Sequence, residues 1–119
     1  MIDSVLEKKG ENISVLDLQG LTSFTDYFLI CSAESEPQMK TIFRNVEERL
    51  SQDGIRPHHV EGQFAAGWVL MDYDDFIVHI FSPEKRLYYE LERLWADAPR
   101  MDVEDALTTQ RGFVKTGIR

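Results

Sequence analysis

Few residues in this sequence have the types and spacing that chemistry requires, and residues 72–75 (Asp-Tyr-Asp-Asp) are the most enzyme-like of them. Two carboxylates one residue apart at the end of a strand can hold Mg²⁺, as nucleotidyltransferases require. Such an enzyme also needs a glycine-rich turn that grips phosphate, and residues 19–25 contain no closely spaced glycines. Acidic residues are common in tight turns because they hydrogen-bond their own backbone. The sequence therefore favours a structural turn, with a Mg²⁺-dependent nucleotidyltransferase as the alternative.

The histidines and the single cysteine form no recognisable catalytic or metal-binding motif. His58 and His59 are adjacent, so on a strand they would point to opposite faces and could not bind one metal ion together. His79 lies in an apolar segment, which favours a hydrogen-bonded core histidine over a metal ligand. Cys31 has no partner for an internal disulfide, and its apolar neighbours predict a buried thiol. We expect no catalytic residue, no metal and no cofactor.

Trp68 and the acidic residues near it in the sequence are better suited to binding a protein than to catalysis. These acidic residues are Glu61, Asp72, Asp74 and Asp75. An indole supplies apolar contact area and carboxylates pair with lysine or arginine, so we expect a solvent-facing indole inside a rim of acidic residues, which would fit a basic protein surface. From spacing alone, an ordinary core position for Trp68 is an equally good interpretation.

Hydrophobic periodicity predicts the elements that position these residues. Helical spacing is present near the N-terminus and after residue 35, while alternating or wholly apolar segments of four to eight residues indicate strands. The predicted elements are helix 1–9, strand 12–18, strand 26–33, helix 35–54, edge strand 57–61, an antiparallel hairpin of strands 68–72 and 76–81, and a last helix from 83 to 97.

The two main helices have clear start signals. Ser35 and Ser82 are suited to the cap position, each with a proline in the first turn, and Gln38 can reach back toward the cap. In the last helix we expect Leu87, Leu91, Leu94 and Trp95 to face the core with Tyr88 beside them. The order of elements predicts an α/β fold with a mixed β-sheet flanked by helices. We expect a single domain over residues 1–99 and a loosely attached C-terminal tail over 100–119.

Composition limits the classes of partner. The chain has 119 residues, a formal net charge of −8 and 43% hydrophobic residues, as expected for a small globular protein. A negative surface repels phosphate backbones, so direct DNA binding is not expected and a basic partner is favoured. No apolar segment approaches the roughly 20 residues of a membrane helix, and the N-terminus does not resemble a signal peptide. We therefore expect a cytoplasmic protein without a membrane partner.

Several blocks of the sequence, in order, resemble the ribosomal silencing factor family, also called RsfS or Iojap-like. The resemblance covers residues 10–95, and its blocks are 15–20 (Val-Leu-Asp-Leu-Gln-Gly), 23–28 (Ser-Phe-Thr-Asp-Tyr-Phe), 60–62 (Val-Glu-Gly), 67–79 and 88–95. It implies a nucleotidyltransferase-like fold without the catalytic set, and therefore a protein that is not an enzyme. Tyr73-Asp74 departs from the family, in which many members have a glycine at the second of these positions.

The resemblance also implies a function. Family members bind a protein of the large ribosomal subunit, the universal fourteenth protein, at the surface that the small subunit would cover. This binding blocks subunit joining and represses translation under nutrient limitation. Members are often homodimers when free, and organelle relatives assist assembly of the large subunit, which is the alternative function. Transferred to this sequence, the predicted partner-binding residues are Glu61, Trp68, Asp72, Tyr73, Asp75 and His79.

Overall fold

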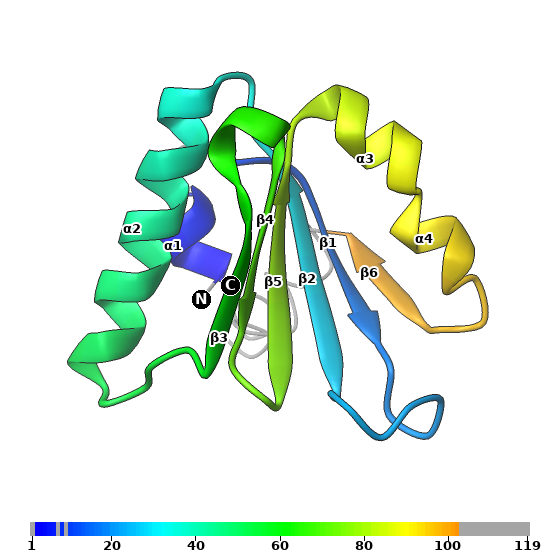
Figure 1. Ribbon diagram of the computed structural model, residues 1–119. Helices are drawn as coiled ribbons and strands as arrows, with labels where there is room; N and C mark the ends of the chain where they lie inside the picture. The colour runs from blue at the N-terminus through cyan, green and yellow to red at the C-terminus, as the bar shows by residue number, and fades with distance from the viewer. Residues whose placement is uncertain (1, 7, 9, 103–119) are drawn as a thin grey trace, which may run out of the picture.

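The computed structural model describes residues 2–6, 8 and 10–102, and its centre is a six-stranded mixed sheet (Figure 1). The strand order is β3-β4-β5-β2-β1-β6. Only β2 and β5 pair in parallel in this sheet, and all its other pairs are antiparallel. The strands are β1 (Glu11–Asp17), β2 (Tyr27–Ser32), β3 (His59–Gln63), β4 (Trp68–Asp72), β5 (Phe76–Phe81) and β6 (Arg100–Asp102). The predicted mixed sheet flanked by helices is confirmed.

Helices cover both faces of the sheet. α1 (Ile2–Leu6) and α2 (Glu36–Gln52) lie on one face, and α3 (Pro83–Tyr89) and α4 (Leu91–Leu94) lie on the other, as Figure 1 shows. A short 3₁₀ helix, η1 (Phe64–Ala66), joins β3 to β4. No helix in the described part of the chain is long and apolar enough to cross a membrane.

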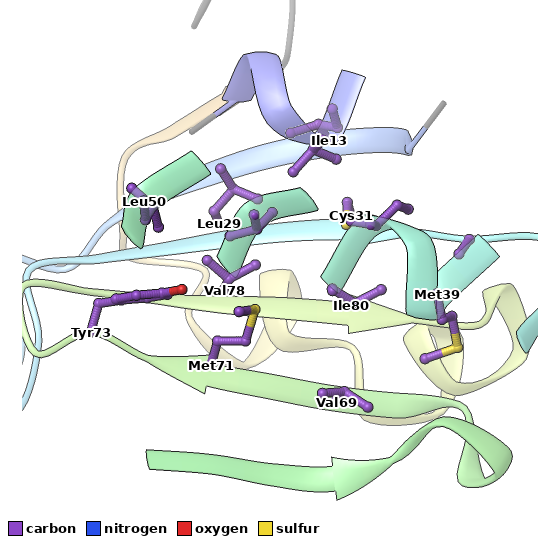
Figure 2. Close-up of a cluster of buried hydrophobic side chains, with 14 residues drawn as sticks. Ile13, Leu29, Cys31, Met39, Leu50, Val69, Met71, Tyr73, Val78 and Ile80 are labelled. Carbon is purple, nitrogen blue, oxygen red and sulfur yellow. The ribbon is translucent and has the colours of Figure 1, made fainter. Parts of the chain in front are cut away.

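The larger core lies between the sheet and α2. Because side chains alternate along a strand, every second residue of β2, β4 and β5 points toward this helix. The helix contributes one apolar stripe, whose buried members are Met39, Ile42, Val46 and Leu50. Figure 2 shows these layers meeting, with Cys31 on β2 among them. The Cys31 thiol is fully buried, and this burial raises its pKa to about 12 against the opposing charge of Arg86.

The smaller core lies on the opposite face. Its buried residues are Leu16, Leu18, Phe28, Ile30, Ile77, Phe81 and Ala98, with Trp68, Leu70, Leu91 and Trp95 packed at its margin. All five residues of β3 are exposed, and Trp68, Leu70 and Asp72 of β4 are only partly covered. The sheet face formed by β3 and β4 is therefore left partly open.

The start signals read from the sequence place the beginnings of α2 and α3 as predicted. The Ser35 hydroxyl accepts from the backbone N–H of Gln38 at 3.2 Å, and the Ser82 hydroxyl accepts from that of Lys85 at 3.2 Å. The side chain of Gln38 reaches back beyond the cap residue and accepts from the Glu34 N–H at 2.6 Å. The two serine bonds satisfy N–H groups that the first turn of a helix leaves without a partner, and the Gln38 bond fixes the chain just before the cap.

The predicted last helix is interrupted. Glu90 adopts a left-handed conformation with φ of 45°, which ends α3 and starts α4 in a new direction. The change of direction alters which side chains face the sheet. Leu87, Tyr88 and Leu94 are 74%, 75% and 72% exposed, so their predicted core positions are wrong. Leu91 and Trp95 do pack on the smaller core.

A partly buried ionic cluster connects the α3–α4 pair to the sheet. Arg86 donates to the hydroxyls of Ser32 and Ser14 at 3.0 and 3.4 Å, and it is paired with Glu92. Burial alone would raise the pKa of Glu92, but the hydrogen bond and charge of Arg86 hold it below its ordinary value. The cluster links α3, α4, β1 and β2, which fixes the neighbouring Tyr89 over the sheet.

The sheet extends beyond the predicted domain boundary at residue 99. Residues Arg100–Asp102 form β6, which pairs antiparallel with β1, so this part of the predicted loose tail belongs to the sheet. Sequence alternation cannot reveal a strand of three residues. The rest of the predicted tail, 103–119, lies outside the described residues.

Candidate functional site

β4 divides the predicted site residues between the two faces of the sheet. Val69 and Met71 point toward α2, and Tyr73 follows them into the same core with 6% of its surface exposed. Trp68, Leu70 and Asp72 occupy the alternate positions and therefore lie on the opposite face. The predicted contact of Tyr73 with a partner does not fit this placement, because its ring packs in the interior, as Figure 2 shows.

Trp68 is half-buried at the start of β4, where three aromatic rings surround it. Its ring plane lies within 6° of that of His79 and within 9° of that of Phe81. Tyr89 from α3 tilts against the indole with a centroid distance of 5.2 Å. The indole Nε1–H donates to Nδ1 of His79 at 3.2 Å. Trp68 is thus neither an ordinary core residue nor a free surface residue, because one part of the ring is packed and the rest is exposed.

His79 is a buried, neutral histidine with 5% of its surface exposed. Burial lowers its pKa to about 4, because a charged imidazole is poorly solvated there. The ring of Phe28 meets the imidazole edge-on at 4.6 Å. The hydrogen-bonded core interpretation of His79 is therefore confirmed. A burial of this depth leaves no side-chain surface for direct contact with a partner.

Strand register determines which residues lie beside the indole. In the β3–β4 pair, Gln63 lies opposite Trp68, Glu61 opposite Leu70, and His59 opposite Asp72. Directly opposed residues of neighbouring strands have their side chains on the same side of the sheet. We call the surface formed by His59, Glu61, Gln63, Trp68, Leu70 and Asp72 the β3–β4 face, on which Nε2 of His59 lies 3.0 Å from the Glu61 carboxylate. Helices leave this face partly uncovered, and Glu61 is 55% exposed on it.

The carboxylates form an elongated strip along this face and not a ring around the indole. Trp68 and Asp72 stand at opposite ends of β4, which at about 3.3 Å per residue separates their Cα atoms by roughly 13 Å. Asp74 and Asp75 are still further along, in the turn after β4. Of the predicted acidic residues, Glu61 is the nearest to Trp68 in register.

The acidic turn hydrogen-bonds itself, as the structural interpretation predicts. Oδ1 of Asp72 accepts from the backbone N–H of Asp74 at 2.9 Å, and Asp74 also pairs with His58. The backbone carbonyl of Asp75 accepts from the N–H groups of Asp26 and Tyr27, which joins this turn to the start of β2. Within the described residues, no group of three or more His, Cys, Asp or Glu side chains could hold a metal ion.

Two residues of the site were not identified from the sequence. Leu70 occupies the centre of the β3–β4 face and is half-buried, between the indole and the Asp72 carboxylate. Leu70 is two residues from both Trp68 and Asp72, and strand residues at i, i+2 and i+4 share a face, so the sequence spacing could have placed it in the site. Tyr89 is 42% exposed and touches Trp68, a contact between distant segments that sequence spacing does not reveal.

An indole with an adjacent apolar side chain and a strip of carboxylates is suited to contact with a basic protein surface. The apolar part loses water on contact, and the carboxylates at 61 and 72 can pair with lysine or arginine.

Comparison with known proteins points to one family. The family described as ribosomal silencing factor during starvation matches residues 1–116. A ribosomal silencing factor of Bacillus subtilis is 41% identical over 98 residues, which cover 82% of this chain and 83% of that protein. A crystal structure of a protein from Chromobacterium violaceum superposes with a TM-score of 0.76 at 33% identity, covering 80% of this chain and 79% of that one. A more distant relative from Mus musculus, 26% identical over 80% of this chain and 43% of its own length, is named for mitochondrial assembly of the ribosomal large subunit.

Proposed function

Because the chain belongs to the ribosomal silencing factor family, we propose that it binds the large ribosomal subunit and sterically blocks joining of the small subunit. The proposed partner is the subunit protein at the joining interface, the universal fourteenth protein that the family resemblance implies. Occupation of that surface would repress translation under nutrient limitation. The protein would act in the cytoplasm, and it would act by occupying space and not by catalysis.

The observation that carries this proposal is the β3–β4 face. A half-buried indole lies on one open sheet face with Leu70, Glu61 and Asp72. Partly packed aromatic residues are frequent anchors of protein interfaces, because their contact area is large and their conformations are already restricted. The net charge of −8 supports a basic partner over a nucleic acid.

Sedimentation with purified large subunits tests whether the indole of Trp68 contributes to binding. We expect Trp68→Ala to weaken binding by about 2 kcal/mol or more, a loss of roughly 30-fold in affinity. Phe24→Ala is the matched control, because Phe24 is a 55% exposed aromatic residue in the loop before β2. Undiminished binding of a folded Trp68→Ala protein would show that the anchor is misassigned.

Variants that change one charge test whether the carboxylates of the β3–β4 face contribute to binding. Glu61→Lys on β3 and Glu48→Lys on the exposed side of α2 change the net charge equally, so only position distinguishes them. We expect Glu61→Lys to weaken binding at least tenfold, about 1.4 kcal/mol, and Glu48→Lys to have a much smaller effect. Equal effects of the two variants would mean that overall charge, and not this face, determines binding.

Assembly of the large subunit is the second candidate function, and the name of the Mus musculus relative favours it. Repression and assembly would use the same contact surface, so binding experiments alone do not separate them. Depletion of the protein from cells separates the two functions. Immature large subunits during growth would support assembly, whereas unchanged subunits with sustained translation during starvation would support repression.

We also propose that the free protein is a homodimer, as the family resemblance implies. Exposed apolar side chains on the α3–α4 pair favour a second copy as a partner, because they would lose water on association. Sedimentation velocity of the pure protein tests this. A single species of about 27.6 kDa, twice 13.8 kDa, is expected, and a monomer at micromolar concentration would contradict it.

A further inference from the structure

We propose that His79 is a positioning residue, which fixes the indole of Trp68 in the orientation that a partner contacts. This inference rests on the proposed function of the β3–β4 face. It gives His79 an indirect role, because its buried side chain offers no surface to the partner.

The geometry around the indole is specific. Nδ1 of His79 accepts the indole N–H at 3.2 Å, while Phe81 and Tyr89 pack against the indole ring. An acceptor at Nδ1 requires a neutral imidazole whose proton is on Nε2. The imidazole is itself held by Phe28, whose edge-on ring lies 4.6 Å away. Packing fixes the imidazole, and one hydrogen bond then fixes the indole.

A role in packing alone does not explain a histidine at this position. Its strand neighbours are apolar, with Leu70 of β4 and Ile30 of β2 directly opposite. The Nε2 atom is buried and has no hydrogen-bond partner among the described residues. A buried polar atom without a partner is destabilising, so an apolar side chain would pack here at lower free energy. The feature that an apolar side chain cannot supply is the acceptor at Nδ1.

A fixed indole favours binding for a physical reason. A half-buried tryptophan whose N–H pairs with water can rotate, and it loses that freedom when a partner binds. With the N–H already paired inside the protein, the ring presents its exposed part in one orientation before contact. His79 would therefore increase affinity by preorganisation, without touching the partner.

Two variants of nearly equal shape separate positioning from packing. His79→Asn keeps an acceptor oxygen close to the place of Nδ1, and His79→Leu has the same branching without the acceptor. If the acceptor positions the indole, His79→Asn retains binding to large subunits within about threefold, and His79→Leu loses about tenfold. If His79 acts only in packing, the order is reversed, because leucine suits the apolar surroundings better than asparagine.

Nuclear magnetic resonance of the free protein gives a readout independent of the ribosome. Trp68→Phe assigns the indole N–H signal of Trp68 and separates it from that of Trp95. In the unmodified protein we expect slow solvent exchange of this N–H and an imidazole of His79 protonated at Nε2. In His79→Leu the exchange should accelerate at least tenfold, and in His79→Asn it should remain slow.

The outcomes distinguish the two proposals. Rapid exchange in the unmodified protein, protonation of His79 at Nδ1, or unchanged subunit binding by His79→Leu would overturn the role of His79. If the N–H is protected as expected but the unmodified protein binds no large subunits, the proposed function is overturned and the fixed indole is supported. The measurements on the unmodified protein remain decisive if His79→Leu fails to fold.

Discussion

At the scale of single residues, two positions near Trp68 accept only a restricted type of residue. Burial lowers the pKa of His79 to about 4, and Gly62 lies in β3 with φ of 92°. His79 must stay uncharged, and position 62 must lack a side chain. Both requirements affect the free energy of unfolding, which can be measured in the free protein.

The free energy of unfolding should fall as the pH falls from 6.5 to 4. In the unfolded chain His79 binds a proton near its ordinary pKa of 6.5, whereas in the folded protein it does so only near pH 4. Between these values the unfolded state binds more protons, so acid favours unfolding. The contribution of neutral His79 to the free energy of unfolding is fully present well above pH 6.5, and on the order of 3 kcal/mol of it is lost by pH 4.

Urea unfolding of the protein and of His79→Asn at pH 7, 6 and 5 measures this effect. The interval ends at pH 5 because the pair formed by Glu92 and Arg86, in which the carboxyl has a lowered pKa, also weakens in stronger acid. Over this interval the variant should lose less stability than the unmodified protein. Parallel pH dependences would mean that the imidazole is protonated as easily in the folded state as in the unfolded state.

Gly62→Ala should destabilise the protein by about 3 kcal/mol or more. A Cβ atom at this position would lie 2.2 Å from the carbonyl oxygen of Trp68, in addition to the strain of a positive φ. Gly54→Ala is the matched control, because Gly54 has φ of 77° but no atom within 4 Å of the added methyl group. It should cost only about 1 kcal/mol, from the backbone conformation alone.

Thermal or urea denaturation compares the two glycine variants. The difference between them isolates the close approach of β3 to β4, since both positions have a similar φ. Two equal losses would indicate that β3 moves away from β4 at little cost.

At the scale of elements, local chemistry predicted most of the fold. The cap at Ser35 and the apolar stripe from Met39 to Leu50 specify α2, and two short apolar segments joined by residues 73–75 specify the hairpin of β4 and β5. These signals succeed because the residues that produce them are close together in the chain. Strand β3 was predicted over 57–61 and lies at His59–Gln63, a shift that leaves Glu61 within it.

The sequence could not predict features that depend on distant contacts. Periodicity continues through Glu90, so a single helix was expected, whereas the chain turns there and brings Glu92 to Arg86. The site was predicted only in part for the same reason. Spacing placed Trp68 and Asp72 correctly at the two ends of β4. The expectation of a charged rim around the indole failed, because sequence proximity does not give distance along a strand.

The ionic cluster should be important for holding α3 and α4 on the sheet. Arg86→Ala removes the nearer of the two arginines that pair with the Glu92 carboxylate, which is 16% exposed and keeps Arg100 at 3.9 Å, and it should destabilise the protein by about 2 kcal/mol. Arg93→Ala is the control, because Arg93 is 82% exposed and its pair with Glu90 should contribute less than about 1 kcal/mol.

Chemical denaturation measures both arginine variants. Adding Glu92→Gln to Arg86→Ala should recover part of the loss, since it removes a partly buried charge that has lost its nearer arginine. A double variant as unstable as the sum of the two single changes would mean that the two side chains act independently.

At the scale of the whole molecule, the net charge of −8 should determine how binding depends on salt. If the partner surface is basic, raising salt from 50 to 300 mM should lower the association rate constant with large subunits by at least fivefold. The dissociation rate should change less, because the indole contact is not screened. Stopped-flow measurements test this, and an association rate independent of salt would argue against a basic partner.

Because Cys31 is buried beneath α2, its reactivity can report how often α2 separates from the sheet. The thiol is at the middle of the sheet, beneath α2, and its raised pKa leaves almost no reactive thiolate in the folded state. An alkylating reagent can therefore modify it only in molecules whose α2 has separated from β2, or whose chain has unfolded. The rate of alkylation under native conditions then gives the population of those open molecules. A bound partner that slows this rate must favour the closed form, wherever on the surface it attaches.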